Sequence, residues 1–414
     1  MTPVIDQRWR MAGLAFLTQN FATGLTFGSF GAILLAIEAR HQTTRTLSSL
    51  GLSLAIVSLS LLAPILGTAL TKRISIRTSM AAGICLGALG YSLLALAPNI
   101  HTLLAIYLFI IGPSLVLFGN LPSNTLVATW FGARPGKAMG LVNMPILVML
   151  TPLAAAAILN SFGLGAVFVA IAIAHLCILP CVLLVKDGPF ALRGASVAPA
   201  GQDRLFVRPE FWLLAVACGI ASGAGVMKMS HLAAIVIEQG YSVTLAVQLL
   251  AISGAAGLLG SPLFGWLADR IGGLRAMVLN VLIQAASFSI LLAPIGPTAL
   301  FLDAIVIGVC GAGVTPALGV IYARLFGPEN YGRALGLMSF ATLPFVFGMT
   351  PLASALFDVS GDYVAPIAAM TMLLIMAGGC FWGLHFREGR QSGAASVAPQ
   401  GVGATLNAGQ THGD

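Results

Sequence analysis

Charged side chains are scarce in this sequence. Asp, Glu, Lys and Arg together make up 8% of its 414 residues, whereas 58% of the residues are hydrophobic. Soluble domains carry about 25% charged residues, so the composition excludes a soluble globular protein. Apolar stretches of about 20 residues, the length that a helix needs to cross a hydrocarbon layer of about 30 Å, recur along the chain. We therefore expect an all-α integral membrane protein.

Motifs for nucleotide binding and catalysis are also missing. The sequence contains no P-loop, no zinc-type array of His and Glu, and no nucleophile elbow. The six cysteines all lie in apolar segments without a companion cluster of histidines or carboxylates, which favours a packing role over a metal or redox site. We therefore expect no enzymatic activity, no cofactor, no metal site and no direct use of ATP.

Proline, glycine and charged clusters divide the apolar sequence into twelve segments, each long enough for a membrane-spanning helix. The first segment is too long for the apolar part of a signal peptide, so we expect it to be retained. The segments cover residues 11–37, 47–70, 78–97, 101–129, 138–159, 164–185, 210–237, 243–268, 276–293, 298–323, 334–356 and 363–385.

The basic residues are distributed unequally between the two sides of this twelve-helix scheme. If the N-terminus is cytoplasmic, Arg40 and Arg45 fall outside, Lys228 lies within a span, and the other seventeen of the 20 Lys and Arg residues are cytoplasmic. The positive-inside rule therefore predicts that both termini are cytoplasmic, and we expect the cytoplasmic (inner) membrane of a bacterium. The net charge of +7 follows from topology and requires no nucleic-acid partner.

A polar stretch at residues 187–208 separates two groups of six spans. We expect an N-terminal six-helix bundle at 1–186, a cytoplasmic linker at 187–208 and a C-terminal six-helix bundle at 209–386. Residues 387–414 are rich in Gly, Ala, Ser and Gln without apolar periodicity, which predicts a disordered cytoplasmic tail.

Short motifs recur in the two halves at a nearly constant spacing. GKAMGL at 136–141 is matched by GRALGL at 332–337, and TPLAAA at 151–156 by TPLASA at 350–355. Pro64 and Gly67 are matched in the same way by Pro262 and Gly265. Parallel repeats of this kind build transporters in which two bundles move about a site near the bilayer midplane.

The segment GWLADRIGGLR at 265–275 resembles the signature loop of the major facilitator superfamily. In that loop an acidic residue and basic residues latch the cytoplasmic ends of neighbouring helices. The resemblance covers residues 10–386 and implies a fold of two six-helix bundles, with Asp269, Arg270 and Arg275 in the latch. The first-half copy, GTALTKRISIR at 67–77, has Thr71 at the acidic position, which predicts a weaker or differently built latch in that half.

Within the superfamily, residues 24–34, 45–59 and 130–141 resemble the monocarboxylate transporter-like group. The sequence lacks two features of that group's animal members. One is an Asp-Gly pair before the first span. The other is an Asp and an Arg one turn apart in the eighth span, where this chain has Gly257 and Ser261. The group's substrate-binding cation is therefore missing from its usual place.

One lysine lies in the middle of an apolar span. Lys228 is ten residues from Glu238 at the outer end of the seventh span, or ~15 Å along a helix. An isolated charge at this depth costs from roughly 3 to more than 10 kcal/mol, so such charges usually face a wet cavity. The superfamily resemblance implies that the first, fourth, seventh and tenth spans line that cavity. We expect Lys228 to face it and bind an anionic substrate; the alternative is snorkelling to the outer interface.

Two titratable residues lie near the same depth. His231 shares a helical face with Lys228, and Asp303 lies close to the outer end of the tenth span. Histidine titrates near neutral pH, and a carboxylate at this depth can pair with either neighbour, so we expect both residues to handle a coupled proton. The alternatives are a hydrogen-bonded packing histidine and a water-exposed carboxylate at the interface.

Further polar residues complete the expected substrate site, and two glycines are expected to serve gating. Asn120, Asn124, Asn143 and Tyr322 are the predicted substrate-binding residues besides Lys228; Asn20 and Gln284 are weaker candidates. Hydrogen bonding between helices is the alternative for the fourth-span asparagines. Gly223 and Gly225 are expected to let the seventh span bend during gating.

These residues predict a secondary active transporter of small organic anions of the monocarboxylate type. We expect symport with protons by alternating access. The alternative is a proton-driven exporter of amphipathic or drug-like compounds. The expected partners are the anion, the proton and the lipid bilayer, with the chain acting as a monomer.

Overall fold

The structure, a computed structural model, describes residues 2–190, 209–293 and 296–396. Every regular element in these ranges is helical, which confirms the all-α class. Two short π-helical turns, Gly24–Gly28 and Tyr107–Ile111, interrupt the first and fourth spans, and a 3-10 turn covers Pro328–Asn330.

The helices of the first half are α1 (Thr2–Thr23), α2 (Ser29–His41), α3 (Arg45–Lys72), α4 (Ile76–Leu96), α5 (Ile100–Ile106), α6 (Gly112–Phe118), α7 (Asn120–Phe131), α8 (Gly136–Val142) and α9 (Ile146–Val182). Those of the second half are α10 (Pro209–Glu238), α11 (Val243–Ile271), α12 (Gly273–Ile290), α13 (Pro297–Phe326), α14 (Tyr331–Ser360) and α15 (Val364–Ser396).

Eleven helical stretches in the described ranges are long and apolar enough to cross a membrane. One of them, Gly136–Val182, has 47 residues, about twice the length that one crossing needs. Within it Gly163 adopts φ 81° and ψ 177°, a conformation that breaks the helix and that glycine tolerates. The stretch therefore holds the predicted fifth and sixth spans, and the twelve-helix scheme is confirmed.

The last helix ends later than the sequence analysis predicted. Helix α15 continues to Ser396, beyond residue 385 and into the segment predicted to be a disordered tail. Residues 386–396 contain Glu, Arg, Gln and Ala, which favour helix, and no proline. Residues 191–208 of the predicted linker and 397–414 of the predicted tail lie outside the described residues.

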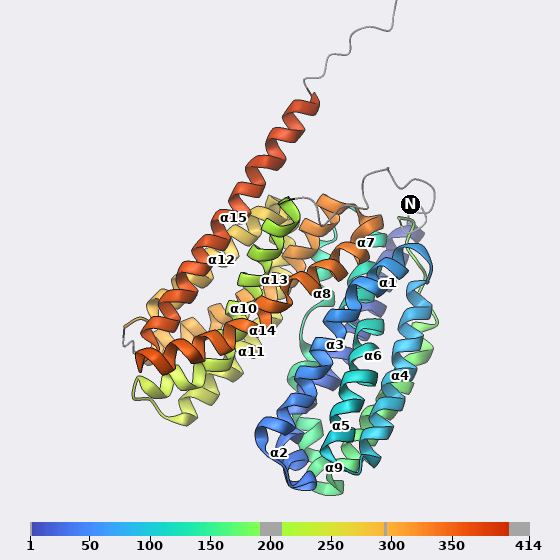
Figure 1. The fold of residues 1–414 in the computed structure, drawn as a ribbon. Coiled ribbons are helices and arrows are strands. Elements are labelled where there is room, and N and C mark those ends of the chain that lie inside the picture. Colours follow the sequence, from blue (N-terminus) through green and yellow to red (C-terminus); the bar gives the residue numbers. More distant parts are fainter. Residues whose placement is uncertain (1, 191–208, 294–295, 397–414) are drawn as a thin grey trace, which may run out of the picture.

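The two groups of helices meet at one end of the molecule and diverge toward the other. Figure 1 shows α1–α9 on the right and α10–α15 on the left, in contact near the N-terminus. We call this the basal end; it holds Gly136 and Asp269. The opposite end, with His41 and Tyr363, is the apical end. The main contacts between the halves join α3 to α14 and α8 to α11.

The repeated motifs form these two contacts. At the first, Gly67 packs directly on the backbone of Gly332, and Gly336 packs on that of Ala63. The second joins Gly136 to Gly265 and Gly140 to Ser261, where a Cβ on Gly140 would lie 2.7 Å from the Ser261 carbonyl oxygen. Only glycine allows such close approach of two helix backbones. The GKAMGL and GRALGL motifs and the matched Pro-Gly pairs are thus the surfaces on which the halves touch.

Candidate functional site

A buried ion pair lies inside the second half. Lys228 Nζ donates hydrogen bonds to Asp303 Oδ1 at 2.8 Å and to Ser287 Oγ at 2.7 Å, which joins α10, α13 and α12. Ser287 Oγ also donates a short hydrogen bond to Asp303 Oδ1. The side chains of Lys228 and Asp303 are 2% and 1% exposed, and Nζ lies 4.4 Å from the centre of the Phe288 ring. The lysine charge is therefore paired, hydrogen-bonded and shielded from water.

The predicted orientation of Lys228 differs from the observed one. The lysine neither faces an open cavity nor snorkels to an interface, because its ammonium lies between three helices against Asp303. Burying the lysine charge costs free energy, and pairing with a carboxylate offsets part of this cost. The buried orientation therefore does not require an open cavity. Asp303 is likewise buried and not exposed to interfacial water. Its second carboxylate oxygen, Oδ2, is buried without a hydrogen-bond partner among the described residues.

Polar side chains of α12 extend this cluster along one face of the helix. Asn280, Gln284 and Ser287 are four and three residues apart, which places them on the same face. Asn280 Nδ2 donates to the Cys310 carbonyl at 2.9 Å, and Gln284 Nε2 donates to Asn280 Oδ1 at 2.6 Å. Ser287 was not predicted from the sequence, although a polar stripe along an apolar span was a signal that could have identified it.

His231 belongs to a different cluster. Its Nδ1 lies 2.9 Å from the hydroxyl of Tyr363, and no hydrogen bond or ion pair in the described ranges joins it to Lys228 or Asp303. A tyrosine hydroxyl is protonated at neutral pH, so that of Tyr363 can donate to the imidazole. His231 Nε2 is buried without a partner in the described structure.

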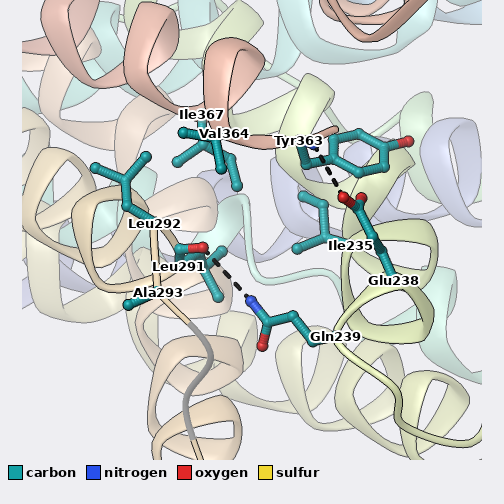
Figure 2. A pocket seen from close by; sticks show the side chains of 9 residues that line it. All are labelled: Ile235, Glu238, Gln239, Leu291, Leu292, Ala293, Tyr363, Val364 and Ile367. Atoms are coloured by element: carbon teal, nitrogen blue, oxygen red, sulfur yellow. Dashed lines mark hydrogen bonds between the residues drawn. The ribbon is translucent and has the colours of Figure 1, made fainter. Parts of the chain in front are cut away.

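Figure 2 shows how the apical end of α10 is tied to its neighbours. The backbone N–H of Tyr363 donates to Glu238 Oε1 at 3.2 Å, and Gln239 Nε2 donates to the Leu291 carbonyl at 3.4 Å. These residues surround a cavity of about 180 Å³ that is otherwise lined mainly by aliphatic side chains. The contacts join α10 to the beginning of α15 and to the end of α12.

The asparagines of the first half bond mainly to one another. Asn143 Nδ2 donates to Asn124 Oδ1 at 2.8 Å, and Asn124 Nδ2 donates to Asn120 Oδ1 at 2.6 Å. Asn20 Oδ1 accepts from the backbone N–H of Leu147 at 3.1 Å. Asn120 is exposed and lines a cavity of about 270 Å³ between the halves, beside Ser339 of α14. Asn124 is buried, as the alternative of helix-to-helix bonding predicted.

Tyr322 and Gly223 serve helix packing in this conformation. The Tyr322 hydroxyl is buried and lies 3.8 Å from Cys218 Sγ. A Cβ on Gly223 would lie 2.6 Å from the Phe345 carbonyl oxygen of α14, so this glycine permits close contact between α10 and α14. Helix α10 runs unbroken from Pro209 to Glu238, and the predicted bend is not present in this conformation.

The acidic residue of the predicted latch, Asp269 of α11, bonds to the first half of the chain. Asp269 Oδ1 and Oδ2 accept hydrogen bonds from the backbone N–H groups of Gly136 and Lys137, at 2.9 and 2.8 Å. A carboxylate at the beginning of α8 also complements the helix dipole. The two arginines bond elsewhere: Arg270 stacks 4.8 Å from the Trp266 ring centre, and Arg275 Nε donates to His385 Nε2 at 3.0 Å.

A larger cavity, of about 500 Å³, lies between α10 and α13. Ser222, Gly225 and Met229 line it from α10, and Gly311 and Thr315 line it from α13. Lys228 is absent from this wall, because its side chain turns toward α12. The seventh and tenth spans thus enclose a cavity with hydroxyl groups and apolar surface.

Comparison with known proteins decides the family. The family model described as the Major Facilitator Superfamily matches residues 16–342 and 258–408. The chain belongs to this superfamily. The fold and the relatives of this major facilitator protein are those of membrane transporters, which are not enzymes, and we describe it as a transporter from here on.

Two relatives of this transporter are monocarboxylate transporters. Monocarboxylate transporter 13 of Rattus norvegicus is 25% identical over 377 residues, which cover 88% of this chain and 87% of that protein. Monocarboxylate transporter 11 of Mus musculus is 25% identical over 401 residues, with 91% and 87% covered. These matches confirm the resemblance to the monocarboxylate transporter-like group.

A solved structure shows the same fold. The fucose:proton symporter FucP of E. coli superposes with a TM-score of 0.70 at 18% identity, and the match covers 91% of this chain and 98% of that one.

Proposed function

We propose that this transporter carries small organic anions of the monocarboxylate type together with protons, by alternating access. The buried Lys228–Asp303–Ser287 cluster carries the proposal. The pair has no net charge when both groups are ionised, and a proton added to Asp303 would leave one uncompensated cation. In a low-dielectric interior that cation is costly until an anion joins it. A proton and an anion therefore enter together at lower cost than either enters alone.

The other predicted residues keep their proposed roles around this pair. Asn120, exposed in the cavity between the halves, contacts the substrate from the first half, and Asn124 and Asn143 hold its amide in place. His231 passes protons between the apical end and the pair, and Asp269 controls opening at the basal end. The proposed setting is a monomer in a bacterial inner membrane. The names of the relatives, both monocarboxylate transporters, support the substrate class.

We expect a proton gradient alone to drive uptake. Purified protein in ATP-free proteoliposomes should accumulate a radiolabelled short-chain monocarboxylate when the outside is acidic. Asp303→Asn should abolish this accumulation but retain exchange of labelled for unlabelled substrate, because the cation persists and the titrating group is lost. Lys228→Ala should abolish both. Ser289→Ala is the matched control, because it removes an α12 hydroxyl whose one hydrogen bond within the described residues is to the Ala285 carbonyl. A requirement for ATP would exclude the proposal.

The alternative, proton-driven export of amphipathic compounds, is favoured by the size and apolar wall of the cavity between α10 and α13. Competition separates the two functions. Under the anion proposal, short carboxylates compete for a Lys228-dependent site. Under export, amphipathic cations are carried by Lys228→Ala as well as by the parent, and short carboxylates do not compete.

The orientation in the membrane gives a separate prediction. A single cysteine at position 45 should react with an impermeant maleimide added outside intact cells, and one at position 77 should react only after the membrane is opened. Arg45 and Arg77 lie at the apical and basal ends, at the beginnings of α3 and α4. The reverse pattern of labelling would invert the proposed topology.

A further inference from the structure

The polar stripe of α12 leaves one acceptor unused. Because the Cys310 carbonyl can only accept, Asn280 must turn its Nδ2 toward it and its Oδ1 toward Gln284. Gln284 in turn must direct Nε2 at Asn280 Oδ1. These two bonds fix the orientation of the Gln284 amide and leave Oε1 free, and no hydrogen bond to Oε1 is present in the described residues. Gln284 is only 5% exposed.

Gly225 separates this oxygen from the cavity between α10 and α13. A Cβ at position 225 would have one neighbour within 4 Å outside its own helix, Gln284 Oε1 at 3.8 Å. The same glycine forms part of the wall of the cavity of about 500 Å³. The absent side chain therefore leaves a gap with the cavity on one side and the free amide oxygen on the other.

We propose that Gly225 and Gln284 form a subsite that recognises a hydroxyl group on the transported acid. This inference rests on the proposed function and adds a specificity-determining residue to it. An amide oxygen only accepts hydrogen bonds, so its ligand must be a donor, and a carboxylate is not one. Met229 in the same cavity wall can contact the carbon chain. The subsite therefore selects small hydroxy monocarboxylic acids over acids without the hydroxyl.

Paired substrates test the subsite directly. In proteoliposome counterflow, lactate is compared with propionate, and 3-hydroxybutyrate with butyrate. The parent protein should prefer the hydroxy acid by about tenfold in half-saturating concentration, the effect of one hydrogen bond to the amide oxygen. Gly225→Ala adds a methyl at van der Waals distance from Gln284 Oε1, without a clash, and should reduce the preference to near unity.

Two further variants distinguish recognition from a general effect on the cavity. Gly311→Ala narrows the same cavity, has no neighbour within 4 Å of its Cβ position, and should retain the preference. Gln284→Met keeps the side-chain length without the acceptor and should lose the preference as Gly225→Ala does. Melting temperatures of the purified variants check that each is folded.

The outcomes separate the subsite from the proposed function. Equal transport of hydroxy and unsubstituted acids by the parent protein would overturn the subsite and leave monocarboxylate transport in place. Equal effects of Gly225→Ala and Gly311→Ala on the preference would also overturn it. Absence of transport for all four acids would overturn both the subsite and the proposed function.

Discussion

Replacing Lys228 alone by alanine should destabilise the protein by about 3–5 kcal/mol, because it leaves the Asp303 carboxylate buried without its counter-ion. Asp303 is 1% exposed, and Oδ2 has no partner among the described residues even when the lysine is present. The expected measurement is a large fall in melting temperature of the detergent-purified protein.

The double replacement Lys228→Met with Asp303→Leu should recover most of that loss. Both charges are then removed together, and well-packed apolar side chains of similar size often match a buried ion pair in stability. Transport should not recover, because neither a titrating group nor a cation is left. Lys186→Ala, at an exposed lysine near the basal end, is the control and should change stability by less than about 0.5 kcal/mol. Normal stability of Lys228→Ala would show that the pair does not stabilise the fold.

Asp269→Ala should weaken the closed basal end. It removes two hydrogen bonds from a charged acceptor to Gly136 and Lys137, each worth roughly 1.5–3 kcal/mol. Only part of this free energy stabilises the closed state relative to the open state, because the N–H groups bond to water when the halves separate. A shift of 1.5–3 kcal/mol changes the ratio of basally closed to basally open molecules by roughly ten- to a hundredfold.

Distances between spin labels at positions 134 and 275, on opposite halves, can report this ratio in a background without the six native cysteines. The parent should show mainly the short distance, and Asp269→Ala should add a long one. Arg270→Ala is the control, because Arg270 stacks on Trp266 in its own helix and makes no hydrogen bond or ion pair with α8 in the described ranges. Equal behaviour of the two variants would exclude the carboxylate as the element that holds α8.

The sequence predicted the fold well because its main signals are independent of detailed packing. Span length follows from membrane thickness, and the repeated glycines mark contacts that exclude any side chain. Gly67 and Gly265 could therefore be matched from sequence and were found at equivalent crossings. The break at Gly163 was also predicted as a gap between spans, although no loop separates the two helices there.

The site was harder to predict because the rotation of each helix about its axis decides which side chains meet. The depth of Lys228 in the membrane could be predicted from the sequence. Its direction could not, because the next residue on α10, Met229, lies in the cavity wall while Lys228 lies on the buried face. Packing of α10 against α12 and α13 sets that rotation, and no local signal encodes it. For the same reason Ser287 was missed, and His231 was expected near Asp303 although it contacts Tyr363.

The two crossings between the halves differ in one respect that ionic strength should reveal. Both are close contacts of glycine backbones, but within the described residues it is the α8–α11 crossing that adds a carboxylate bonded to the other half, and Thr71 occupies the matching position of the first half. Dissolved ions screen charges near the surface and leave the fit of two backbones unchanged. The crossing of α8 with α11 should therefore respond to ionic strength more strongly than the crossing of α3 with α14. The salt concentration on the basal side should then shift the ratio of basally open to basally closed molecules, and it should do so through the α8–α11 crossing.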